Sequence, residues 1–180
     1  MDYKTKPTTR AVLRKFSKVF RAVYEVSEEG KFPVLDSLEK LPNIFPNCSF
    51  EIIDDRELPR NTMAQCYQNE RGGFTIAIKE SVYSGAYRGI GSDLGFICHE
   101  MCHVFLFYIG FTPVFEYSFN DREIPAFCSV EWQAKALCAE VMIPYKESKG
   151  MNEKEIIKRF NVSKAFAAKR VKLDTSVSNK

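Results

Sequence analysis

Both histidines of the chain lie in one short segment, Cys98-His99-Glu100-Met101-Cys102-His103, four positions apart. On a helix, residues i and i+4 share a face, so the two imidazoles can reach one metal ion. Zinc suits imidazole nitrogens, and the glutamate after the first histidine is turned aside, where it can take a proton from a water molecule at the metal. The pattern His-Glu-x-x-His therefore predicts zinc ligands at His99 and His103 and a general base for peptide hydrolysis at Glu100.

This chemistry requires a helix around the motif, which we predict over residues 93–109 with Ser92 as its cap. At about 100° per residue, apolar side chains cover the face opposite the histidines, namely Leu94, Ile97, Met101, Val104, Phe105 and Tyr108. Cys98 and Cys102 form a stripe of their own beside the histidines. We expect this helix to be buried on nearly all sides. We do not expect a membrane span over residues 95–115, because that stretch holds both histidines, Gly110 and Pro113.

A catalytic zinc needs a third protein ligand and one open position. Because the sequence has no third histidine, this ligand must be a carboxylate or a thiol. The downstream candidates are Glu116, Asp121, Glu123, Glu131, Glu140, Cys128 and Cys138.

Helical geometry narrows this set. Residues 130–143 are predicted to form a helix that Ser129 caps and Pro144 ends. On it, Glu131 and Cys138 fall on one largely apolar stripe, whereas Glu140 lies about half a turn away. We predict Glu131 as the third ligand, with Cys138 as its competitor.

The remaining elements predict an α+β fold in a single domain, residues 1–180. Further helices are expected at residues 9–30 (amphipathic) and 34–40, strands at 49–54, 63–68 and 73–79 with a hairpin turn at 69–72, a loop at 83–91, and a helical pair at 152–172. Residues 49–144 are the predicted catalytic core, a small and mostly antiparallel sheet packed on helices. The opening helix carries a basic face, which we interpret as solvated.

Composition sets broad limits. The chain has 180 residues, 45% of them hydrophobic, and a net charge of +3, which does not indicate nucleic acid or a membrane surface as a partner. The N-terminus lacks the apolar run of a signal peptide, so the expected location is the cytoplasm. The six cysteines are not spaced like a disulfide framework, and we interpret them as reduced, mostly buried small hydrophobes.

The motifs resemble the ImmA/IrrE family of metallo-endopeptidases over about residues 73–171. That family carries a buried His-Glu-x-x-His helix and then a helix of the form Glu-x-x-Ala-x-x-Phe-Ala-x-x-Leu-Leu-Met-Pro, which here reads EWQAKALCAEVMIP from Glu131. The resemblance implies His99, His103 and Glu131 as ligands of one zinc ion and Glu100 as the general base. The chain departs from the family at Cys102, where glycine is usual, and a side chain there is expected to lie against the sheet or near the metal.

The resemblance also implies a zincin-like fold and a protein substrate. In such folds an edge strand binds the substrate backbone, a role that we expect for the strand carrying Phe74, Ile76 and Ile78. Members often cleave a DNA-binding repressor, so a repressor is the expected substrate class. Separately, stabilisation of the transition state needs a further donor, for which the candidates are Tyr87, Arg88 and Tyr108.

The C-terminal pair at residues 152–172 leaves an alternative open. It is similar to a helix-turn-helix whose second helix carries basic residues, namely Lys164, Lys169, Arg170 and Lys172. The alternative function is a transcription regulator or interaction module with a structural or vestigial metal site. We favour a two-helix cap on the core, and direct nucleic-acid binding is not expected, because base-reading side chains are sparse where the second helix starts.

Overall fold

A computed structural model describes residues 2–113 and 124–178 of the protein. The described residues form eight α-helices, one short 3-10 helix and three β-strands. In chain order these are α1 (Arg10–Val23), α2 (Val34–Ile44), β1 (Ser49–Ile53), β2 (Ala64–Gln68), β3 (Phe74–Lys79), α3 (Glu80–Tyr87), α4 (Gly91–Tyr108), η1 (Ala126–Cys128), α5 (Val130–Met142), α6 (Tyr145–Ser148), α7 (Glu153–Phe160) and α8 (Lys164–Ser178).

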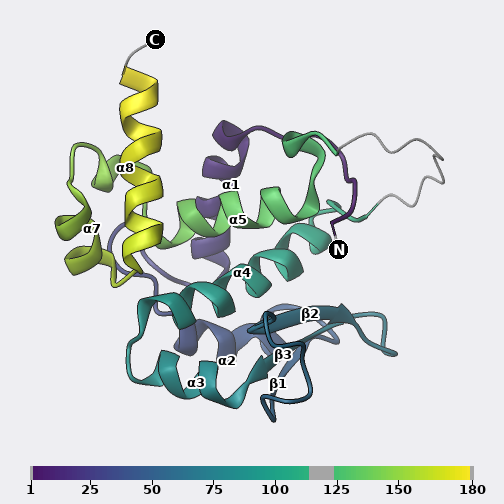
Figure 1. The fold of residues 1–180 in the computed structure, drawn as a ribbon. Coiled ribbons are helices and arrows are strands. Elements are labelled where there is room, and N and C mark those ends of the chain that lie inside the picture. Colours follow the sequence, from purple (N-terminus) through teal and green to yellow (C-terminus); the bar gives the residue numbers. More distant parts are fainter. Residues whose placement is uncertain (1, 114–123, 179–180) are drawn as a thin grey trace.

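Helix α4 runs through the centre of the fold (Figure 1). The sheet, α2 and α3 pack on one side of it, and α5, which itself packs on α1, lies on the other. Ile97, Met101 and Val104 are fully buried, as the apolar pattern predicts, whereas Tyr108 at the helix end is partly exposed. Since both ends of α4 and nearly all its faces meet other elements, its histidines are held on a rigid frame.

The sheet is mixed, which corrects the prediction of a mostly antiparallel one. Its strand order is β1-β3-β2, with β1 parallel and β2 antiparallel to β3. The hairpin after β2 places β3 between the two earlier strands, so β1 acquires a parallel neighbour. The three strands themselves are confirmed close to their predicted bounds, and so is the turn, where the Gly72 N–H donates to the Asn69 carbonyl.

Residues 83–91 are not the predicted loop, since most of them belong to α3. Gly85 lies inside this helix because α3 approaches α4 closely: a Cβ at that position would lie 1.9 Å from an Asp93 carboxylate oxygen. The glycine therefore serves packing rather than a turn. Helix α4 also begins earlier than predicted, with Ile90 rather than Ser92 at its N-cap.

The first two helices differ from prediction mainly at their ends. Helix α1 is capped by the Thr9 side chain and ends at Val23, well before the predicted end at residue 30. Helix α2 continues past Pro42, since this proline lies in the last turn and the Phe45 N–H still donates to the Leu41 carbonyl. One member of the basic face, Arg21, is buried rather than solvated.

The predicted C-terminal helical pair is present as α7 and α8. Asn152 begins α7 with a capping box, and Asn161 ends it in the left-handed conformation, at φ 54°. On α8, Arg170 is directed into the protein, where its guanidinium donates to Glu140 Oε1 at 3.2 Å. One of the four basic residues considered for DNA binding thus attaches α8 to α5 instead.

Across the described parts of the chain, no helix combines the length and the apolar character that crossing a membrane requires.

Candidate metal centre

Helices α4 and α5 bring the three predicted ligands together. His99 and His103 lie one turn apart on α4, and Glu131 lies in the first turn of the neighbouring α5. The start of α5 is fixed because the Ser129 hydroxyl accepts from the Trp132 N–H at 2.8 Å. The cap therefore fixes the position from which the Glu131 side chain projects toward the histidines.

The donor atoms are spaced as ligands of one ion would be. The two histidine Nε2 atoms lie 3.2 Å apart, and each lies 3.4 Å from a carboxylate oxygen of Glu131. In tetrahedral coordination with bonds of about 2.0–2.1 Å, neighbouring donors lie about 3.3 Å apart. The three residues could therefore hold one metal ion. Their side chains range from 7% exposed at His103 to 37% at Glu131, so the centre reaches solvent.

Glu100 lies beside this centre without joining it. Its Oε2 accepts from the Cys66 N–H at 2.8 Å, and its Oε1 lies 3.9 Å from His99 Nε2. One oxygen is thus anchored on β2 while the other faces the ligands. This arrangement suits a group that exchanges a proton next to a metal rather than one that coordinates it.

Burial and neighbouring charges set the pKa values of these groups. Burial raises the pKa of Glu100, against the opposing effect of His99 and His103. Hydrogen bonds from His103 and His99 hold the pKa of Glu131 well below its usual range. For His99, burial favours the neutral ring, but Glu131 and Glu100 outweigh it and the pKa is raised. In the metal-free centre, Glu131 is therefore ionised and His99 holds its proton more tightly than usual.

The other candidate third ligands lie elsewhere or outside the described residues. Glu140 is enclosed by arginines, with Arg14 Nε 3.0 Å from its Oε2. Cys138 groups with Cys98 and Cys102 rather than with the histidines. Cys128 belongs to neither group of metal-binding side chains. Glu116, Asp121 and Glu123 lie outside the described residues.

The candidate donors for the transition state are not brought to the centre by any described contact. The Tyr108 hydroxyl donates to the Pro46 carbonyl and its ring packs on Phe45, away from the histidines. Tyr87 and Arg88 are exposed at the end of α3, where Asn161 contacts the neighbouring Gly89. His99 lies eight residues after Gly91, the first residue of α4, which is about 12 Å along the helix axis from the end near α3.

The predicted substrate strand is wrong, because β3 is the central strand of the sheet and pairs on both sides. Its Ile76 and Ile78 are fully buried, and Phe74 packs on Phe107. Among the described strands, β2 is instead the edge nearest the centre: it pairs with β3 on one side, and on its other side the Cys66 N–H points to Glu100.

Two residues near the centre were missed by sequence reasoning. Lys135 Nζ lies 3.5 Å from Glu131 Oε2, one turn along α5, and the Phe107 ring lies 5.8 Å from that of His103. Both were detectable in principle, because each lies four residues after a predicted ligand on the same helix. In the described structure the His99 Nδ1 atom is buried without a hydrogen-bond partner.

No protein-family model matches the chain, and no curated protein matches it significantly. The resemblance to ImmA/IrrE metallo-endopeptidases therefore depends on the two helical motifs alone. What the described residues establish is a His-His-Glu group that could hold a metal ion, with a second carboxylate beside it.

Proposed function

We propose that the protein is a zinc-dependent endopeptidase with His99, His103 and Glu131 as ligands and Glu100 as general base. The observation that carries this proposal is the spacing of the ligand atoms: the two histidine Nε2 atoms lie 3.2 Å apart, each lies 3.4 Å from one of the two Glu131 carboxylate oxygens, and a non-ligating carboxylate lies beside them. A structural zinc site is usually closed by four protein ligands, whereas three ligands leave a position open for chemistry. We also propose that the fold is related to that of the zincins.

A bound zinc ion would polarise the scissile carbonyl and make an attacking water more acidic. Glu100 then takes the proton of the attacking water at Oε1, while the Cys66 N–H holds Oε2 in place. The raised pKa of Glu100 suits both steps of its task, since a stronger base accepts this proton more readily and can pass it to the leaving amine.

The proposed substrate is a regulatory protein, with a DNA-binding repressor as the class that the resemblance suggests. We assign its docking to the outer edge of β2, in place of β3. An extended peptide added to that edge would run past Glu100, since Cys66 already directs its N–H there.

The test is Glu100→Gln, measured as cleavage of candidate repressors together with zinc content. The amide keeps the shape and the hydrogen bond from Cys66 but cannot take the proton. We expect one zinc per chain as in the wild type and a fall in kcat of about 10²–10⁴-fold.

The same variant tests the alternative of a regulator with a structural metal site. In that case Glu100→Gln would leave biological activity unchanged, because a structural site has no use for a base. Retained cleavage by Glu100→Gln would equally remove Glu100 from the proposed mechanism.

A further inference from the structure

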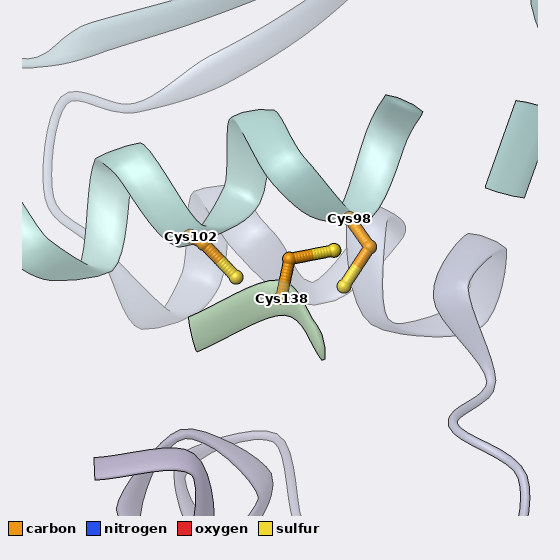
Figure 2. A group of neighbouring side chains, drawn as sticks. All are labelled: Cys98, Cys102 and Cys138. Carbon is orange, nitrogen blue, oxygen red and sulfur yellow. The ribbon is translucent and has the colours of Figure 1, made fainter. Parts of the chain in front are cut away.

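A second group of potential ligands lies between α4 and α5. Figure 2 shows Cys98 and Cys102 projecting from α4 and Cys138 from α5 into the space between the two helices. Their three sulfur atoms all lie within 4.8 Å of one another. The side chains are 0%, 0% and 3% exposed, and all three cysteines are free.

This spacing matches three sulfurs around one ion. With a metal–sulfur bond of about 2.3 Å, three thiolates arranged in a plane about one ion lie about 4 Å apart. The other cysteines do not share this arrangement: Cys48, Cys66 and Cys128 belong to no such group among the described residues. A cysteine can be buried simply as a small hydrophobic residue, which would explain any one of these thiols. It does not explain why three of them lie together.

Two buried polar groups interact with the cysteines: a guanidinium with no carboxylate partner among the described residues and a hydroxyl with no hydrogen-bond partner. Arg21 is 1% exposed and donates to backbone carbonyls, and none of the described carboxylates forms an ion pair with it. Burial lowers the pKa of Arg21, and Cys98 is the group that opposes this most strongly. A buried cation beside thiols provides the counter-charge that a thiolate site requires.

Tyr24 is the second of these groups. It is fully buried, and its hydroxyl has no hydrogen-bond partner in the described structure. Burial raises its pKa, and Cys102 and Cys98 raise it further. A thiolate would give this otherwise unpaired donor an acceptor.

We infer that Cys98, Cys102 and Cys138 form a second metal site that takes one soft monovalent ion, Cu(I), in three-coordinate thiolate geometry. Thiolates select soft ions, and zinc would require a fourth donor, which the described residues do not bring to this group. Each thiol that binds gives its proton to solvent, and the oxidation state of copper does not change. The site is separate from the proposed zinc centre, although both join α4 to α5.

The test uses the reduced, metal-free chain, loaded anaerobically with Cu(I) in competition with a chromophoric Cu(I) chelator. We expect one Cu(I) per wild-type chain, and a fall in affinity of at least about 100-fold in Cys102→Ala and in Cys138→Ala. Cys128→Ala is the matched control, since Cys128 is also buried but lies outside the group. His103→Gln should bind copper normally although it loses zinc.

Equal copper binding by Cys102→Ala and the wild type would overturn the inference, as would loss of copper in Cys128→Ala or in His103→Gln. A second readout needs only the wild-type chain: during brief alkylation in mild denaturant, bound copper should protect Cys98, Cys102 and Cys138 but not Cys48. Uniform alkylation of all six cysteines in the copper-loaded chain would contradict the site independently of how the variants fold.

Discussion

At the scale of single residues, two glutamates on α5 have different surroundings. Glu131 meets two histidines at 3.4 Å, and its side chain is 37% exposed. Glu140 is 0% exposed and lies among Arg10, Arg14 and Arg170. The same residue type thus belongs to a group that could hold a metal ion at one end of the helix and to an ion cluster further along it.

Zinc affinity should depend on the first glutamate and not on the second. Glu131→Gln removes the charged member of the three proposed ligands. Loss of a residue that only hydrogen-bonds to a ligand lowers metal affinity by up to about 100-fold, so we expect a larger fall in zinc affinity here. Glu140→Gln should leave the zinc affinity of the folded chain unchanged. Zinc competition titrations on both variants measure this, and equal losses would show that Glu131 is not the third ligand.

At the scale of elements, β2 is connected to α4 by the hydrogen bond that the Cys66 backbone N–H donates to the Glu100 carboxylate. Helices α1, α5 and α8 are joined by the arginines that surround Glu140, while Arg170 also donates to the Ala139 and Ile143 carbonyls. The two connections act on different functions, the first on the geometry of the base and the second on the position of the C-terminal helices.

Cys66→Pro should reduce cleavage while leaving the metal in place. Proline removes the N–H that holds Glu100 Oε2, and an edge strand tolerates proline. We expect kcat to fall at least about 10-fold with unchanged zinc content, since a misplaced catalytic group is costly. Cys66→Ala, which keeps the N–H, is the control, and equal activity of the two variants would show that this hydrogen bond has no role.

Glu140→Gln should destabilise the protein, by about 3–5 kcal/mol in the free energy of unfolding, because it leaves the buried Arg170 without its counter-charge. Although burial opposes ionisation, Arg14 and Arg170 lower the folded-state pKa of Glu140 below 4.5. Its stabilising effect is therefore complete above pH ~4.5 and is lost as the pH falls further.

Urea unfolding between pH 3 and pH 7 tests this, and the variant should lose less stability than the wild type on the acid side. Arg14→Gln is the milder control, since Arg14 is 33% exposed and Arg10 and Arg170 remain. A pH dependence identical to that of the wild type would show that Glu140 is not the titrating group.

At the scale of the whole molecule, α4 and α5 together carry both proposed metal sites. The histidines and Glu131 form one group of potential ligands, and the three thiols form a second, between the two helices. Because each proposed site needs both helices in their folded positions, an ion bound there would stabilise the native state relative to the unfolded chain.

Removing zinc should therefore lower the thermal stability of the copper-free protein. Zinc at 100 times its Kd contributes about 2.7 kcal/mol, which corresponds to a fall in Tm of roughly 5–10 °C when a chelator removes it. Calorimetry with and without chelator measures the shift. His103→Gln should show no shift, and an equal shift in that variant would place the stabilising metal elsewhere.

The sequence by itself determined what depends on local spacing. The i, i+4 histidines, the Ser129 cap and the apolar stripe on α5 follow from helical periodicity, so the grouping of His99, His103 and Glu131 was predictable. The three strands were likewise predictable from composition and turn residues. These features depend on neighbours within a few positions.

Only the tertiary structure decided which elements meet. Strand order placed β3 in the centre and left β2 as the edge beside Glu100, because side-chain alternation does not specify a strand's neighbour. Gly85 lies in a helix, where α3 packs against α4, and not in a loop. The Cys102 side chain groups with Cys98 and Cys138, and not with the sheet or the histidines. Such outcomes depend on contacts between residues far apart in the chain, which the spacing of residues within one segment does not predict.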